Sequence, residues 1–301
     1  MSIHRTVLLK ETIDGLNLPT LAGRKPRSVI VDGTFGGGGH SVEVCERCPT
    51  AQILAFDQDE NALKKKDAFK KCDISFVNEN FRNIDKVLDK MEVKEVDGII
   101  LDLGLSSDQL ENSGRGFSFK KNEPLLMTMK ANPNANDITA KDAINSWSEK
   151  SLADIIYGFG EERFAKRIAK AIVEAREQGE INTTEKLVKV IEGAVPKAYK
   201  SKRIHFATKT FQAIRMAVND ELEALKEGLE KGFKFLSRGG RMSVISFHSL
   251  EDRIVKQFFR KVAANGEARL INKKVIVAGE EELKDNPRAR SAKLRILEKI
   301  K

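Results

Sequence analysis

The chain of 301 residues is long enough for one large domain or two smaller ones with a real hydrophobic core. Its 41% hydrophobic residues include no apolar run of membrane-spanning length, and Met1–Arg5 leads into no signal-peptide core. We therefore expect a cytoplasmic protein with no membrane partner. The net charge of +9 favours a polyanionic partner.

The cysteines are Cys45, Cys48 and Cys72. Cys45 and Cys48 have the spacing of redox and zinc motifs, but neither a second pair nor a suitably spaced histidine follows. We interpret them as two incidental thiols on a helix and predict no metal site.

The first hundred residues alternate between strand-like and helix-like patterns. A β-branched apolar run at 28–32 ends in Asp32, and five of the next seven residues are glycine. This order predicts a strand, a glycine turn and a helix over 40–47, as at the start of a cofactor-binding α/β fold. Further strands are predicted at 52–57, 74–78 and 96–103, with helices at 60–71 and 81–91. The alternation indicates a mainly parallel, doubly wound sheet.

The alternation stops at about residue 113, and helical patterns at 140–146, 151–156, 162–176 and 184–194 follow. From about residue 209 the α/β pattern resumes. One long helix is predicted from Phe211 to Leu236 and ends at Gly239-Gly240, followed by a strand at 242–247 and a helix at 250–262. An antiparallel pair at 270–277 and 292–299 closes the chain. The pattern predicts an α/β domain of residues 1–112 and 209–301, interrupted by a helical domain of residues 113–208.

Two acids mark the expected cofactor site. Asp57 ends the second strand, where an acid binds ribose hydroxyls in enzymes that use NAD or S-adenosylmethionine. The glycines lack the spacing that dinucleotides require, which disfavours an NAD oxidoreductase. The alternative for Asp57 is a helix cap, for which Asp59 is better placed. Asp102 ends the fourth strand, where a buried carboxylate would bind either a cofactor ammonium group or the amides of its own loop.

Several blocks in order resemble one family. They lie at 4–9, 32–40, 102–109, 115–119, 157, 160–168, 208–215, 245–254 and 286–291. Together they resemble the bacterial ribosomal-RNA small subunit methyltransferase H family, also called MraW. The resemblance implies a class I S-adenosylmethionine-dependent methyltransferase, α/β and Rossmann-like, with the helical domain 113–208 inserted for substrate recognition. The implied activity is N4-methylation of a cytidine in the decoding region of 16S ribosomal RNA, with the small ribosomal subunit as partner.

The resemblance also implies the residues of the site. The cofactor contacts carried over by position are Gly38, Gly39, His40, Asp57, Phe81, Asp102 and Gln109. Their chemistry agrees in most cases, since the glycine turn admits the methionine moiety and Phe81 offers adenine an apolar wall. His40 is equally compatible with a local helix cap. Asp102 is also our choice of catalytic residue, to orient the reacting groups, although it would equally serve the cofactor alone.

The sequence departs from the family pattern at Leu126, Thr128 and Lys130, where two acids and an arginine are usual, and at Phe206, where proline is usual. These changes affect the expected substrate contacts more than the cofactor blocks. They motivate two alternatives. One is a cofactor-binding RNA chaperone or assembly factor with weak or no methyl transfer, and the other is methylation of another RNA.

Basic residues with interleaved aromatics predict an RNA-binding surface. The candidate substrate residues are Arg163, Lys166, Arg167 and Lys170 on one helix face, Lys202, Arg203 and His205 in the segment 197–209, and His248 after the fifth strand. A third cluster comprises Arg288, Arg290, Lys293 and Arg295. For the lysine-rich faces the alternative is simple solvation, and for His248 it is a helix N-cap.

Overall fold

The computed structural model describes residues 6–18, 28–69, 71–201 and 203–301. It contains two compact units, one formed by the chain up to Gly104 together with Leu222–Lys301, and the other by Leu105–Glu221. The predicted boundaries at 112/113 and 208/209 therefore differ from the observed ones. Leu105 and Leu110 pack against the core of the second unit, and Phe211 and Ile214 are buried in it, which is why these flanking segments belong there.

Within the described residues of the first unit, one sheet has the strand order β3-β2-β1-β4-β5-β7-β6. The strands are β1 (Val29–Asp32), β2 (Gln52–Phe56), β3 (Asp73–Val77), β4 (Val96–Asp102), β5 (Leu236–Ser246), β6 (Ala268–Leu270) and β7 (Lys293–Lys299). β1 to β5 are parallel, whereas β7 is antiparallel to both β5 and β6. The strand order reverses between β1 and β4, where open α/β sheets bind ligands. The predicted fold class is confirmed.

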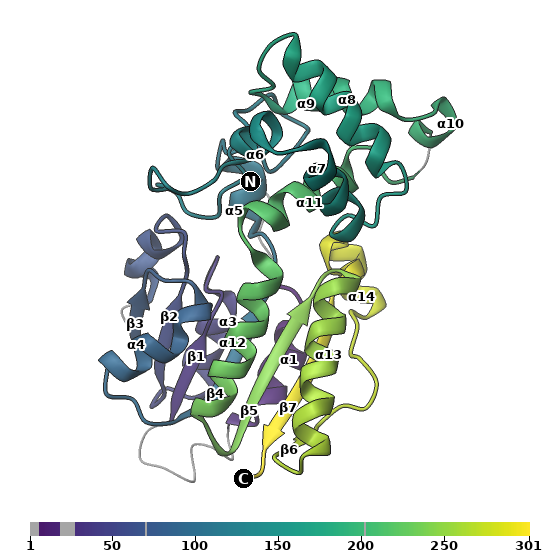
Figure 1. Cartoon of the computed structure of the whole chain (residues 1–301). Helices are drawn as coiled ribbons and strands as arrows, with labels where there is room; N and C mark the ends of the chain where they lie inside the picture. Colours follow the sequence, from purple (N-terminus) through teal and green to yellow (C-terminus); the bar gives the residue numbers. More distant parts are fainter. Residues whose placement is uncertain (1–5, 19–27, 70, 202) are drawn as a thin grey trace. The chain divides into compact units, whose positions relative to one another are not determined.

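Helices cover both faces of this sheet (Figure 1). On one face α4 (Ile84–Lys90), α12 (Glu221–Phe235) and α13 (Ser249–Ala264) bury residues such as Leu88, Leu229 and Phe259 against the strands. On the other, α1 (Leu9–Leu16) and α3 (Gly39–Arg47) bury Leu16 and Val44. The remaining elements are η1 (Ala62–Phe69), η2 (Phe81–Asn83), α14 (Glu280–Asp285) and η3 (Pro287–Ser291). Because both faces are covered, the central strand β4 is almost entirely apolar.

The second unit is helical in its regular structure. Its helices are α5 (Ser107–Asn112), α6 (Ala140–Ser146), α7 (Glu149–Gly158), α8 (Ala165–Glu177), α9 (Thr184–Ala194), α10 (Lys197–Lys200) and α11 (Thr208–Val218). The helices predicted at 140–146 and 184–194 are confirmed to the residue. They share one core, in which Ile144, Ile168 and Leu187 are fully buried. In the described part of the whole chain, no helix combines the length and apolar character that crossing a membrane requires.

The long helix predicted from Phe211 to Leu236 is wrong, because the chain breaks into α11 and α12. Asp220 has a positive φ of 49° at the break. Beside it, the Asn219 amide donates to the carbonyls of Met127 and Arg215, and its Oδ1 accepts from the Met129 amide. These bonds fix the end of α11 to a loop of the second unit, which the 3.6-residue periodicity cannot reveal.

Three other expectations also need correction. The glycine pair 239–240 does not end a helix, because α12 ends at Phe235 and β5 continues through both glycines. The segment predicted as a helix at 60–71 is the shorter 3₁₀ helix η1. Helix α1 was not predicted, and it buries Ile13 and Leu16 beneath the sheet.

Candidate functional site

The glycine turn connects β1 to α3 at the carboxyl edge of the sheet. Gly38 is the N-cap of α3 with φ of 78°, and a Cβ there would collide with the rings of Phe35 and Phe69. A Cβ on Gly39 would collide with the side chain of Thr6. Glycine is therefore required at both positions on steric grounds, because the side chains of Phe35, Phe69 and Thr6 already occupy the space that a Cβ would take.

Three carboxylates follow parallel strands at this same edge: Asp32 ends β1, Asp57 follows β2 and Asp102 ends β4. Neighbouring parallel strands are about 4.8 Å apart, so their carboxyl ends bring these side chains together. Repulsion from Asp32 contributes to the raised pKa of both Asp57 and Asp102. A cluster of acids at a switch point is an environment that favours a cationic ligand.

Of the three carboxyl groups, Asp102 has the pKa that is raised most. Its Oδ1 is buried and has no hydrogen-bond partner among the described residues, while its Oδ2 lies 3.9 Å from Nδ1 of His40 in the first turn of α3. Burial, followed by repulsion from Asp32 and Glu251, raises the pKa of Asp102 to about 8. The carboxyl group is therefore mostly protonated at neutral pH in the free protein.

Asp57 was predicted to be free for a ligand, but both of its carboxylate oxygens already accept hydrogen bonds within the protein. Its Oδ2 accepts from the amide of Gly36 and its Oδ1 from the amide of Asp59, each at 2.8 Å. Asp59 in turn accepts from the amide of Asn61 through its own Oδ1, so it acts as the local cap as expected. A carboxylate has about four acceptor positions, so Asp57 retains capacity for a ligand hydroxyl. Burial is the main cause that raises its pKa to about 6.

Asp32 belongs to this cluster but was not predicted as a site residue. It is fully buried, accepts from the Ser41 hydroxyl at 2.7 Å, and accepts from the Thr34 amide at 3.2 Å. Burial raises its pKa to about 6, against the opposing effect of these two bonds. The signal was available, because an acid at the end of the first strand of a glycine motif lies at the ligand-binding edge.

Phe81 begins η2 directly after β3. It is half-buried, and a Cβ on Gly228 of α12 would collide with its ring. One side of the ring therefore packs on α12. The predicted contact between Phe81 and a cofactor would use the exposed remainder of the ring.

Two predicted site residues have structural roles in helix caps. Gln109 lies in the second unit, where its side chain and that of Ser106 form the capping box of α5. His248 is the N-cap of α13. Its Nδ1 accepts from the amide of Glu251, and its Nε2 lies 3.0 Å from the Glu251 carboxylate. The capping alternative for His248 is thus confirmed.

The basic residues around α8 are exposed. We call Arg163, Lys166, Arg167 and Lys170 the basic stripe. Arg163 lies over the rings of Phe164 and Tyr199 at 4.6 and 5.1 Å from their centroids, and Lys170 pairs with Glu174 at 3.6 Å. The stripe is therefore partly held in place by aromatic and acidic neighbours.

His205 lies in an aromatic stack of the second unit. Its ring is 4.4 Å from that of Phe119 and 4.2 Å from that of Phe206, with interplanar angles of 14° and 29°. Phe206, which departs from the family pattern, thus extends the stack. Arg203 is exposed close by in the chain, whereas Lys202 lies outside the described residues.

The residues at 126–130 that depart from the family pattern lie in a loop whose hydrogen bonds and ion pair involve other residues of the second unit. Arg115 is buried and donates to the carbonyls of Thr128 and Met129, and Lys130 pairs with Asp137 at 2.9 Å. Thr128 and Lys130 therefore take part in local structure. Arg115, which the sequence analysis did not assign, organises this loop.

The interpretation of Cys45 as an incidental thiol is wrong. Cys45 of α3 forms a disulfide with Cys72, immediately before β3, while Cys48 is free and buried. The bridge ties the helix that follows the glycine turn to the segment that precedes the third strand. Among the described residues there is no group of three or more histidine, cysteine or acidic side chains suited to hold a metal.

The model of the MraW methylase family matches residues 1–300. The chain belongs to the MraW methylase family. A curated relative, the ribosomal RNA small subunit methyltransferase H of Limosilactobacillus fermentum, is 41% identical over 99% of this chain and 98% of its own length. Family membership confirms the predicted methyltransferase and its cofactor, S-adenosylmethionine.

Two solved structures are also similar. An rRNA methylase from Streptococcus thermophilus has a TM-score of 0.44 and 12% identity, and the match covers 99% of both chains. NSun6 from Pyrococcus horikoshii has a TM-score of 0.45 and 14% identity, over 99% of this chain and 53% of the other.

Proposed function

We propose that this methyltransferase acts in the cytoplasm and transfers a methyl group to N4 of a cytidine in the decoding region of 16S ribosomal RNA. The name of the Limosilactobacillus relative supports the small-subunit RNA as substrate. The observation that carries the cofactor site is the acidic cluster of Asp32, Asp57 and Asp102 beside the glycine turn. Each of these carboxyl groups has a raised pKa, and bound positive charge would relieve that perturbation.

The residues present fit S-adenosylmethionine. Asp102 offers a buried carboxylate oxygen without a hydrogen-bond partner among the described residues, at the same sheet edge as the glycine turn that leads into α3. Asp102 would hold the ammonium group, Asp57 the ribose hydroxyls and Phe81 the adenine, with the methionine moiety at the glycine turn. When bound, the cofactor supplies an electrophilic methyl group on a sulfonium.

The chain's own contribution to the reaction is positioning. The exocyclic amine of cytosine is a weak nucleophile because its lone pair is conjugated with the ring, so it must be held in line with the methyl group. Asp102 lies at the edge where this alignment is set, and in the second role left open by the sequence its carboxylate would orient the amine. The two roles differ experimentally. Loss of cofactor affinity in Asp102→Asn supports the ammonium contact, whereas a fall in kcat at unchanged affinity supports the amine.

The helical unit supplies the surface expected to bind RNA. The basic stripe offers exposed cations for phosphates, and the stack of Phe119, His205 and Phe206 offers rings of the kind on which unpaired bases stack. Burial lowers the pKa of His205, which favours the neutral form of this ring. We assign the exposed Arg203 to the same surface because it lies two residues before His205 in the chain.

The test is methylation of unmodified small ribosomal subunits or their RNA with purified protein. Mass spectrometry of the released nucleosides should show N4-methylcytidine, and Asp57→Ala should reduce it. RNA binding and S-adenosylmethionine binding without any methylated nucleoside would instead support the chaperone or assembly factor. A different methylated nucleoside would contradict the N4 assignment, and calorimetric binding of NAD would contradict the cofactor.

A further inference from the structure

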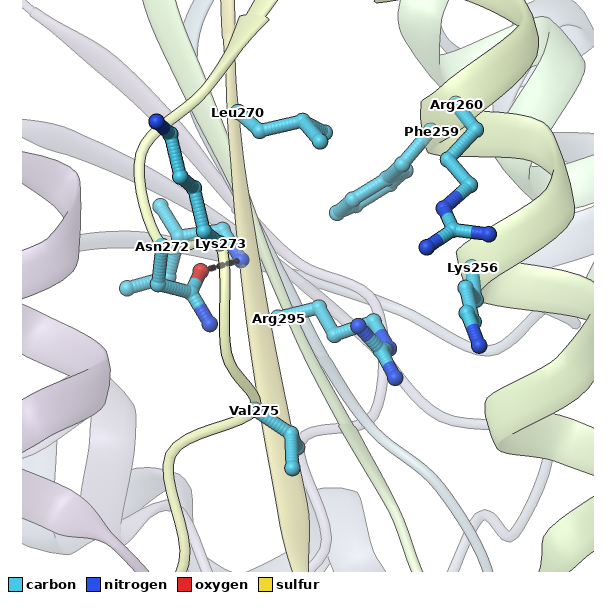
Figure 2. Close-up of a pocket in the computed structure, with 9 residues that line it drawn as sticks. Lys256, Phe259, Arg260, Leu270, Asn272, Lys273, Val275 and Arg295 are labelled. Atoms are coloured by element: carbon cyan, nitrogen blue, oxygen red, sulfur yellow. Dashed lines mark hydrogen bonds between the residues drawn. The ribbon is translucent and has the colours of Figure 1, made fainter.

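A second concave site lies in the first unit, between α13 and β7. It is a cavity of about 310 Å³ that no step of the proposed methyl transfer uses. Figure 2 shows Lys256, Phe259 and Arg260 on one side, Lys273 on the other and Arg295 on β7 between them. The volume lies at the lower end of the range for ligand pockets.

The cavity exists because the edge strand is interrupted. β6 pairs with β7 only from Ala268 to Leu270, and the chain returns to β7 at the isolated bridge between Ile276 and Leu294. Asn272 braces the intervening loop, since its Oδ1 accepts from the Ile296 amide at 2.8 Å and its amide donates to the carbonyls of Lys274 and Leu294. These bonds hold the gap open in the free protein, so the site is preorganised.

The charge around the cavity is unbalanced. Arg295 pairs with Asp252 at 2.8 Å, and Lys293 approaches the same carboxylate at 3.5 Å. In the part of the chain that the structure describes, no carboxylate forms an ion pair with Lys256, Arg260 or Lys273. Lys256 and Arg260 lie one helical turn apart on α13, so their charges repel one another and a bound anion relieves this repulsion, whereas the amine of Lys273 points away from the cavity (Figure 2).

The lining indicates a ligand that is anionic at one end and apolar at the other. The cations suit phosphate oxygens, while the half-buried Leu270 and Val275 present apolar surface beside them. We propose that this cavity binds a phosphate group of the RNA strand together with its attached nucleoside, as a second anchor for the substrate. This rests on the proposed function, because RNA is the polyanion which that function brings to the protein.

The position of the cavity fits one continuous strand. In the sheet register Asp102 of β4 lies opposite Ile245 of β5, and Ile245 lies opposite Leu294 of β7. Arg295, the residue after Leu294, is therefore two strands away from Asp102 and shifted by one residue along β7. Two strand spacings are about 10 Å. A nucleic acid strand rises about 3.4 Å per nucleotide in a duplex, so roughly three nucleotides separate the cavity from the methyl-transfer edge.

The experiment compares two triple variants with equal loss of charge. The first, K256Q/R260Q/K273Q, removes the unpaired cations. The control, R253Q/K261Q/K274Q, removes exposed cations of the same helix and loop that do not line the cavity. Binding of a single-stranded decoding-region RNA is measured as a function of salt for the wild type and both variants, together with S-adenosylmethionine affinity and the melting temperature.

For single strands each neutralised phosphate contributes about 0.7 to the salt slope, so losing the one phosphate held in the cavity should lower the slope of the first variant by about 0.7 and that of the control by almost nothing. Cofactor affinity and melting temperature should not change. Equal salt slopes in the two variants would overturn the proposal. It would also be overturned if the first variant lost binding of cytidine monophosphate while its salt slope for RNA stayed unchanged, because the cavity would then be a site for free nucleotides. Failure of the proposed function is separate, because it would abolish rRNA methylation in the wild type and leave the difference in slopes intact.

Discussion

Replacing Asp102 by asparagine tests the central assignment of the site. The substitution keeps the size of the side chain and removes its ability to ionise. In the free protein the carboxyl group has a pKa of about 8, mainly because it is buried. A cofactor ammonium group would bind the carboxylate and not the neutral acid, so binding must ionise Asp102 wherever the pH is below 8.

The magnitude follows from this pKa. One pH unit corresponds to 1.36 kcal/mol, so ionising Asp102 at pH 7 costs about 1.4 kcal/mol of binding free energy. The apparent Kd should therefore fall roughly 25-fold between pH 6 and 7.5 as the ionised fraction grows. An α-amino group stays largely protonated in this range, so the ligand's own titration contributes little. At pH 7 about 0.9 proton should be released per cofactor bound.

Isothermal titration calorimetry of S-adenosylmethionine in two buffers of different ionisation enthalpy measures both quantities. Asp102→Asn should bind more weakly and show neither the pH slope nor the proton release. Asp32→Asn is the matched variant, because it keeps Asp102 but removes a neighbouring charge that raises its pKa. The midpoint of the pH dependence should then move below 8. An affinity that is flat between pH 6 and 7.5 in the wild type, without proton release, would refute the reasoning.

The same group affects the stability of the free protein. A carboxyl whose pKa is higher in the folded than in the unfolded chain binds its proton more tightly when folded, so its contribution to stability is present at low pH. That contribution is lost as the pH rises from about 4 to 8. Between pH 4 and pH 8 the free energy of unfolding of Asp102→Asn should therefore rise relative to that of the wild type. Urea unfolding of both proteins at the two pH values measures this change.

Three further predictions follow from the site and its supports. Asp57→Ala should weaken S-adenosylmethionine binding by about 1.5–3 kcal/mol in calorimetry, and Asp57→Asn by less because one acceptor oxygen remains; equal affinity in all three proteins would contradict the ribose assignment. Cys45→Ala should lower the free energy of unfolding by about 3–4 kcal/mol, given the 27-residue separation, and reductant should abolish the difference; three titratable thiols in the untreated wild type would disprove the bridge. Neutralising the basic stripe should flatten the salt dependence of RNA binding without changing cofactor affinity, whereas an unchanged slope with full rRNA methylation would make the stripe a solvated face.

Much of the first unit could be predicted because its sequence is locally consistent. The apolar β4 and the glycine turn carry their own signals, and the family resemblance followed from several blocks that occur in order along the chain. The break at Asn219 could not be predicted, since it depends on hydrogen bonds to a loop ninety positions away in the chain. The disulfide was missed for a similar reason, because Cys72 becomes a neighbour of Cys45 only once β2 and β3 have paired.

Within the site, the sequence indicated which residues lie at the carboxyl edge and less well what they contact. Asp57 was expected to be free, yet two backbone amides already bind it. Gln109 was assigned from the resemblance, although Ser106 and Gln109 have the Ser-x-x-Gln spacing of a capping box, a signal that the sequence analysis did not use. Hydrogen bonds between side chain and backbone depend on turn geometry, which residue spacing does not specify.

The interruption of the first unit by residues 105–221 has a consequence for synthesis on the ribosome. When Asp102 emerges, β4 is an uncovered edge strand, because its neighbour β5 and the helices α12 and α13 are not yet made. At roughly 5–20 residues per second the interval between Asp102 and the start of β5 at Leu236 is about 7–27 s. The helical unit is contiguous and contains its own core, so it is able to fold first.

The α/β unit therefore cannot complete its sheet until β5, β6 and β7 have been synthesised. Its largest core cluster joins Val31 near the beginning of the chain to Leu297 near its end. During this interval the open edge of the mostly apolar β4, on the side away from β1, is a template for pairing with another nascent chain. Chaperone demand should accordingly depend less on the size of the protein than on the time for which this one strand stays without its neighbour.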